Sequence, residues 1–268
     1  MWALDPFSPP RSVRLFADTP LPLLATLATG AAVTWALVDR GVLPASALRV
    51  AGVTAGHGAL LATALAWARV PAASGVMVVA VLFLAAWAAV HGVVGPLTYL
   101  APVLSVVWLM WRGRLTDLGL GARVSLRALL TGAAIGALLG AHLLVSASRT
   151  FGLHVRLDHP AEMLGAIGYD VGANVLAAEC FFRGALFNRA LGRWSFASAT
   201  IGSTLAYVVR YLVDPLLPKS AGLVVGAVFY LALLGALNCW LFRWSESLLP
   251  GLLAALIFFA AYRSLATG

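Results

Sequence analysis

The chain has 268 residues, of which 62% are hydrophobic and only 10% are charged. Soluble domains carry about 25% charged residues, so this composition excludes an ordinary soluble domain and indicates a membrane protein. The formal net charge of +8 comes from 18 basic and 10 acidic residues. Because the arginines are scattered among the loops and form no basic patch, we expect no nucleic-acid partner and take the lipid bilayer as the main partner.

Apolar runs of about 20 residues, the length that a helix needs to cross a bilayer, recur along the chain. The two-residue alternation of a membrane barrel is absent. The predicted fold class is therefore all-α, a polytopic bundle of about eight or nine transmembrane helices. The predicted spans lie near residues 21–38, 50–68, 73–91, 95–111, 128–147, 161–189, 195–213, 221–242 and 247–262.

The first apolar run, residues 21–38, follows Arg11 and Arg14. It is longer than the apolar part of a cleaved signal peptide, so we interpret it as the first transmembrane anchor. Placing the N-terminus in the cytoplasm assigns most basic residues to cytoplasmic loops, as the positive-inside rule requires. We therefore predict a cytoplasmic N-terminus.

Glu179 and Arg183 stand out in the predicted span 161–189, within the stretch "AAECFFRGAL". They are four residues apart with the acid first, which is the favourable order for an ion pair on a helix. A charge near the bilayer centre costs about 2.5–3.5 kcal/mol, so neither side chain should face lipid. The pair is either a structural link between helices or part of a functional site.

The segments "AECFFRG", "ALFNRALGRWSFASATIGSTLAYVVRYLVDP" and "SESLLPGLLAALIFFA" together resemble the CPBP intramembrane proteases. This group includes the type II CAAX prenyl proteases and bacterial homologues. The resemblance covers roughly residues 115–263. It implies an accessory transmembrane half at 1–114, a CPBP-like core at 115–268, and a location in a bacterial inner membrane.

The family pattern is two adjacent glutamates, three spacer residues and an arginine, followed by Phe-x-x-x-His and then His-x-x-x-Asn. The resemblance implies that the first glutamate and first histidine activate a water molecule. The later histidine and asparagine then stabilise the oxyanion, without a metal or another cofactor. In this chain Glu179 matches the second glutamate, and Arg183 matches the arginine.

The other family positions are substituted. Ala178 stands where the water-activating glutamate belongs, and Tyr207-x-x-x-Tyr211 aligns with Phe-x-x-x-His. Ala255 and Phe259 occupy the positions of the last histidine and asparagine. Alanine and phenylalanine can neither accept a proton nor donate a hydrogen bond from their side chains. These losses favour a degenerate, non-proteolytic relative, a pseudoenzyme.

Two polar residues could line a remnant of the pocket. Asn174 lies one turn before Ala178, about 40° away around an ideal helix, and Tyr207 lies on the next predicted span. The alternative for both is a role in hydrogen bonds between membrane helices.

The remaining residues that could carry chemistry give no strong pattern. The five histidines are dispersed, whereas a zinc site needs three or four converging ligands. Cys180 and Cys239 both fall inside apolar runs, without the paired spacing of a disulfide framework or a metal site. We therefore expect no metal and no cofactor.

Three functions remain open. The first is binding of a membrane-protein partner or a peptide by a chain that has lost hydrolysis. The second is an active intramembrane endopeptidase whose rebuilt site uses Glu179, with Tyr211 or Asn174 assisting. The third is transport of a small solute, although the internal repeats common in transporters are not visible.

Overall fold

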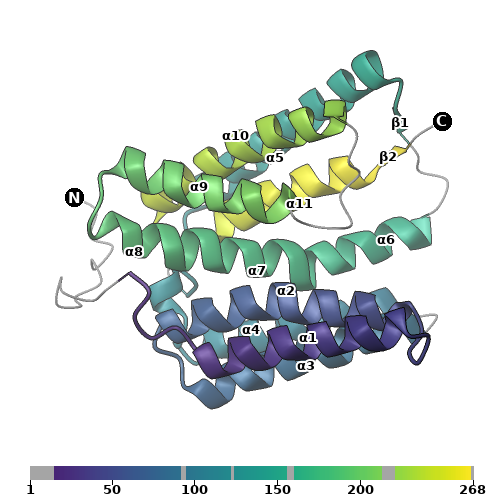
Figure 1. The fold of residues 1–268 in the computed structure, drawn as a ribbon. Coiled ribbons are helices and arrows are strands. Elements are labelled where there is room, and N and C mark those ends of the chain that lie inside the picture. The colour runs from purple at the N-terminus through teal and green to yellow at the C-terminus, as the bar shows by residue number, and fades with distance from the viewer. Residues whose placement is uncertain (1–14, 92–94, 122–123, 156–159, 213–220, 267–268) are drawn as a thin grey trace. The chain divides into compact units, whose positions relative to one another are not determined.

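The computed structural model describes residues 15–91, 95–121, 124–155, 160–212 and 221–266. Nearly all of them are helical (Figure 1), which confirms the all-α fold class. The only strands in the described part are a short antiparallel pair, β1 (His154–Val155) and β2 (Leu265–Ala266). The helices are α1 (Leu21–Asp39), α2 (Ser46–Trp67), α3 (Ala72–His91), η1 (Gly95–Tyr99), α4 (Leu100–Trp111), η2 (Thr116–Leu118), α5 (Leu126–Phe151), α6 (Pro160–Tyr169), η3 (Asp170–Asn174), α7 (Val175–Glu179), η4 (Cys180–Phe187), α8 (Asn188–Leu191), α9 (Phe196–Leu212), α10 (Ala221–Ser245) and α11 (Leu249–Arg263).

Five of the described helices are long and apolar enough to cross a membrane. They are α1, α2, α3, α5 and the Val224–Ser245 part of α10. The segments Leu97–Trp111 and Leu249–Arg263 are apolar but shorter. Each predicted span overlaps one of these helices or another helical run. The chain is therefore an integral membrane protein, while the number of spans stays a prediction.

The orientation of the chain in the membrane also stays a prediction. Arg11 and Arg14, on which the cytoplasmic placement of the N-terminus partly rests, lie outside the described residues.

The predicted span 161–189 is one continuous helical run from Pro160 to Leu191 that contains two π-helical segments, η3 and η4. A π turn bonds each amide one residue further back than an α turn does, and such turns are frequent at functional sites. Glu179 ends α7, and Arg183 lies inside η4. The four-residue spacing of Glu179 and Arg183 predicts a regular α-helix. In the structure the helical run changes from α to π between these two residues.

The chain forms two compact units. Unit 1 comprises the described residues of 1–15, 117–158 and 182–268. Unit 2 comprises those of 16–116 and 159–181. The predicted division into an accessory half, residues 1–114, and a family-like core stays a prediction.

Unit 2 packs around a small apolar core. Its centre is formed by Val50, Val53, Leu82, Ala85, Ala86, Tyr99 and Ala173. Next to this core, His57 Nε2 and the Tyr169 hydroxyl form a 2.6 Å hydrogen bond between α2 and α6. Gly172 is required because a Cβ there would collide with the Tyr99 carbonyl. A partly buried polar pair and a close backbone contact therefore hold these helices together.

Unit 1 depends on close packing of α5 against α11. Gly132, Gly136 and Gly140 repeat at four-residue spacing along one face of α5. A Cβ on Gly136 would lie 2.9 Å from Ala254 Cα, and a Cβ on Gly132 would collide with the Pro250 backbone. Small residues at this spacing let two membrane helices approach until their backbones touch.

We expect Gly136→Ala to lower the free energy of unfolding by about 1–3 kcal/mol, the usual cost of overpacking. The added methyl group would push against the Ala254 backbone, which cannot turn away as a flexible side chain can. Gly226→Ala on α10 is the matched control, because a Cβ there meets nothing within 4 Å. Unfolding of both variants in detergent micelles measures the difference, and equal stabilities would contradict the packing argument.

Candidate functional site

The candidate site residues fall in both units. Unit 2 contains Asn174, Ala178 and Glu179, on η3 and α7. Unit 1 contains those on η4, α9 and α11, namely Arg183, Tyr207, Tyr211, Ala255 and Phe259.

In unit 2 the polar side chains lie on the π-helical part of the run. Asn174 is buried, and its Nδ2 donates a 2.9 Å hydrogen bond to Oδ1 of Asp170, which is also buried. The amide therefore bonds to a carboxylate one turn earlier on its own helical run. Ala178 and Glu179 follow and are each 1% exposed. Ala178 presents only a methyl group, which cannot take a proton from water.

In unit 1 the main feature is the guanidinium of Arg183, a fully buried side chain. Its Cζ lies 4.0 Å from the centroid of the Tyr207 ring, within the range of a cation–π interaction. Gly235 on α10 leaves room for it, because a Cβ there would lie 2.8 Å from Arg183 Nη2. The cation is thus held between an aromatic face on α9 and a glycine on α10.

Hydrogen bonding and ring packing position η4 against α9. Ser203 Oγ donates a 2.6 Å hydrogen bond to the Phe182 carbonyl, a partner outside the regular helix pattern. The Phe182 ring also meets the Tyr207 ring edge-on, at 5.5 Å and 75°. These contacts flank Arg183 and fix its side chain over Tyr207.

From Tyr207 a column of three aromatic rings, hereafter the aromatic column, extends to α11. Tyr207 and Tyr211 meet edge-on at 5.0 Å, and Tyr211 stacks on Phe259 at 5.6 Å with an interplanar angle of 21°. Arg210 adds a second cation–π contact, with its Cζ 4.4 Å from the Tyr211 centroid. Tyr211 and Phe259 are 4% and 5% exposed, and nearby Ala255 is 1% exposed.

The aromatic column decides what this half of the site can do. Tyr211, Ala255 and Phe259 occupy the positions where the resemblance places two histidines and an asparagine. Two of these three side chains are rings that stack on each other, and the third is a methyl group. Ala255 and Phe259 offer no side-chain donor to an oxyanion, and the Tyr211 and Phe259 rings pack against each other.

Groups that could hold a metal are sparse. Among the described residues, no three His, Cys, Asp or Glu side chains lie close enough together to bind one. Cys180 and Cys239 are both buried, and neither forms a disulfide within the described part of the chain. The expectation that the protein uses no metal or cofactor stays a prediction.

The cation–π contact between Arg183 and Tyr207 is the site feature that the sequence did not reveal. The two residues lie on different helical segments, separated by a turn, and their spacing follows no helical repeat. Gly235, which makes room for the guanidinium, lies on a third helix. Only the packing of these three segments brings the groups together.

Comparison with known families supports the resemblance that the Glu179–Arg183 motif indicates. Residues 160–260 match the family model described as type II CAAX prenyl endopeptidase, Rce1-like. The match confirms the resemblance that the motifs indicate. It covers just over a third of the chain and includes every candidate site residue. Searches of curated proteins and of solved structures found no match to the chain.

We expect Tyr207→Leu to lower the free energy of unfolding by about 2 kcal/mol or more, the value of a desolvated cation–π contact. Leucine leaves the buried Arg183 guanidinium without its aromatic face. Tyr207→Phe is the matched control because it keeps the ring, and it should lose much less. Unfolding curves in detergent micelles compare the two variants, and equal losses would show that the ring face does not stabilise the cation.

Proposed function

Residues 160–260 match the Rce1-like prenyl endopeptidases. We propose that this integral membrane protein keeps the fold of that family but has lost its hydrolytic activity. It acts by binding a membrane-protein partner or the tail of a membrane-tethered peptide. The observation that carries the proposal is the stack of Tyr211 on Phe259 in unit 1.

Hydrolysis by general-base catalysis needs two kinds of group. One takes a proton from water, and the others donate hydrogen bonds to the oxyanion. Loss of a single oxyanion donor typically lowers kcat by about a hundredfold to a thousandfold. Ala255 and Phe259 stand at both positions that the resemblance assigns to oxyanion donors, and Ala178 stands at the position of the base. With these three substitutions, the side chains at these positions can neither take a proton from water nor donate a hydrogen bond to the oxyanion.

The packing around Arg183 supports a binding function over a complete loss of function. Arg183 is still buried, its aromatic partner Tyr207 is in place, and Gly235 still leaves room for the guanidinium. A buried arginine is costly in a membrane unless it is covered. A chain that has kept this arrangement has kept the architecture around the former chemistry, which is what recognition of a peptide or a partner requires.

Cleavage and binding of one substrate test the proposal together. The native chain, Ala178→Glu and Glu179→Gln are reconstituted in liposomes with a fluorescent prenylated peptide. We expect no cleavage by any of the three, because each lacks the oxyanion donors, and saturable binding by the native chain. Cleavage by the native chain that disappears in Glu179→Gln would overturn the proposal. Absence of both cleavage and binding would limit it to a protein partner.

The second candidate is an active endopeptidase with a rebuilt site that uses Glu179. The observation in its favour is that Glu179 is 1% exposed in an apolar helical run, since ionisable groups inside membranes are functional candidates by default. This candidate requires that Glu179→Gln abolish turnover while leaving the unfolding transition unchanged. A purely structural glutamate would give the reverse pattern.

A further inference from the structure

Helices α5 and α10 of unit 1 run antiparallel, with grooves along the surface beside them. Arg127 at the start of α5 contacts Trp244 at the end of α10, with 5.8 Å from Cζ to the ring centroid. Further along, His142 on α5 contacts Tyr230 on α10. The first contact marks one end of the helix pair, and the second lies nearer the other end.

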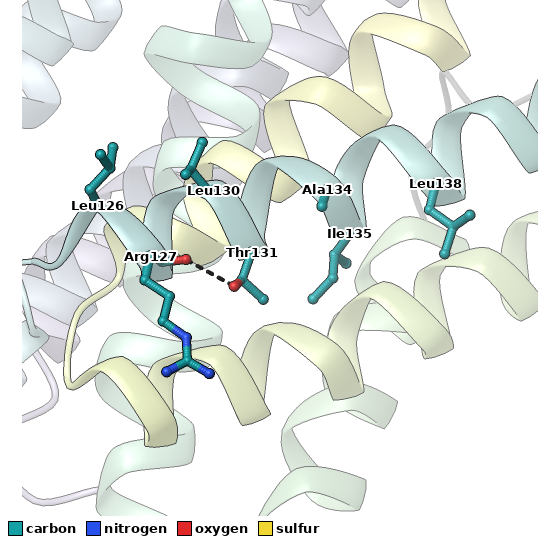
Figure 2. A pocket seen from close by; sticks show the side chains of 7 residues that line it. All are labelled: Leu126, Arg127, Leu130, Thr131, Ala134, Ile135 and Leu138. Carbon is teal, nitrogen blue, oxygen red and sulfur yellow. Dashed lines mark hydrogen bonds between the residues drawn. The ribbon is translucent and has the colours of Figure 1, made fainter.

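The groove at the Arg127 end has a volume of about 640 Å³. Apart from Arg127 and Thr131, its lining is entirely apolar and comes from α5. Leu126, Leu130 and Leu138 are between 61% and 70% exposed. Figure 2 shows Arg127 and Ile135 pointing toward the adjacent helix, with Thr131 Oγ1 turned back to the Arg127 carbonyl. The groove is therefore an open, mostly apolar depression with a basic residue at one end.

The charged end of the groove carries exposed basic residues. The first turn of α5 contains no acidic residue, and Arg127 is exposed. Arg243, next to Trp244 on α10, is also exposed. Trp240 and Trp244 stack at 5.3 Å with an interplanar angle of 6°. Arginine with tryptophan at a helix end is typical of the membrane–water interface.

Toward the opposite end of the helix pair, the polar groups beside the surface bond to each other. A second groove of about 610 Å³ lies there and includes His142, Ser146 and Tyr230. The His142 Nδ1 and the Tyr230 hydroxyl are 2.7 Å apart and bond to each other. That end thus satisfies its polar groups internally, whereas Arg127 is exposed beside the Trp244 ring.

We propose that the groove at the Arg127 end binds one anionic phospholipid, with its phosphate at Arg127 and an acyl chain along the leucines. The charge of Arg127 complements a phosphate, and the apolar lining complements a hydrocarbon chain. The length also fits, because the twelve steps from Leu126 to Leu138 rise about 18 Å along the helix. One leaflet of the hydrocarbon core is about 15 Å thick. This site is independent of the proposed loss of hydrolysis.

Lipid binding to the purified full-length chain tests the site, with native mass spectrometry of detergent-solubilised protein titrated with phosphatidylglycerol. We expect Arg127→Gln to weaken binding about fivefold, as for one basic group at a membrane surface. Arg112→Gln is the matched control, because Arg112 is also exposed and lies 5.4 Å from the Trp108 ring. It should bind like the native chain.

Filling the apolar part of the groove gives a second test that leaves the charge of Arg127 in place. Ala134→Trp fills the groove and should weaken binding, whereas Ala137→Trp places the same ring on an exposed position of α5 that does not line it. Excess inorganic phosphate should not displace the lipid, because it lacks the acyl chain. Equal binding of phosphatidylethanolamine, or equal losses in Arg127→Gln and Arg112→Gln, would overturn the site. Displacement of the lipid by inorganic phosphate would also overturn it, by reducing it to a simple anion site.

Discussion

The structure of unit 1 depends on one constraint, the burial of the Arg183 guanidinium in an apolar helix bundle. A charge in such surroundings is costly unless other groups cover it. Tyr207 supplies an aromatic face at 4.0 Å, and Gly235 supplies the space that any side chain would fill. Three helical segments, η4, α9 and α10, must therefore keep their relative positions for the cation to stay covered.

The candidate chemistry follows from this arrangement. With Tyr207 held against Arg183, Tyr211 lies one turn further along α9 and stacks on Phe259 of α11. Tyr211 and Phe259, at positions that the resemblance assigns to catalysis, thus belong to the packing that extends from the arginine. At positions that the resemblance assigns to water activation and oxyanion binding, unit 1 holds part of the aromatic column. The proposed loss of hydrolysis is therefore compatible with a well-packed fold.

Much of the fold could be predicted because apolar runs of membrane length are a strong signal. The motif around Glu179 and Arg183 also identified the segment that matches the family model. The π-helical turns could not be predicted, since they change the register without changing the residue pattern. The hydrogen bond from the Asn174 amide to Asp170 was not predicted either, and the place of Asn174 beside a pocket stays a prediction. The glycines on α5 carried a readable signal, four-residue spacing, that indicates a close helix contact.

At the positions that the resemblance assigns to catalysis, unit 1 should hold apolar packing and no water-filled pocket. Cysteine labelling measures this directly, with Ala255→Cys in a chain whose buried Cys180 and Cys239 are replaced by alanine. A water-soluble maleimide should label this position only after unfolding, while Arg112→Cys, at an exposed site, should react at once. Rapid labelling of Ala255→Cys in the folded protein would contradict the account, because it requires water beside the residue.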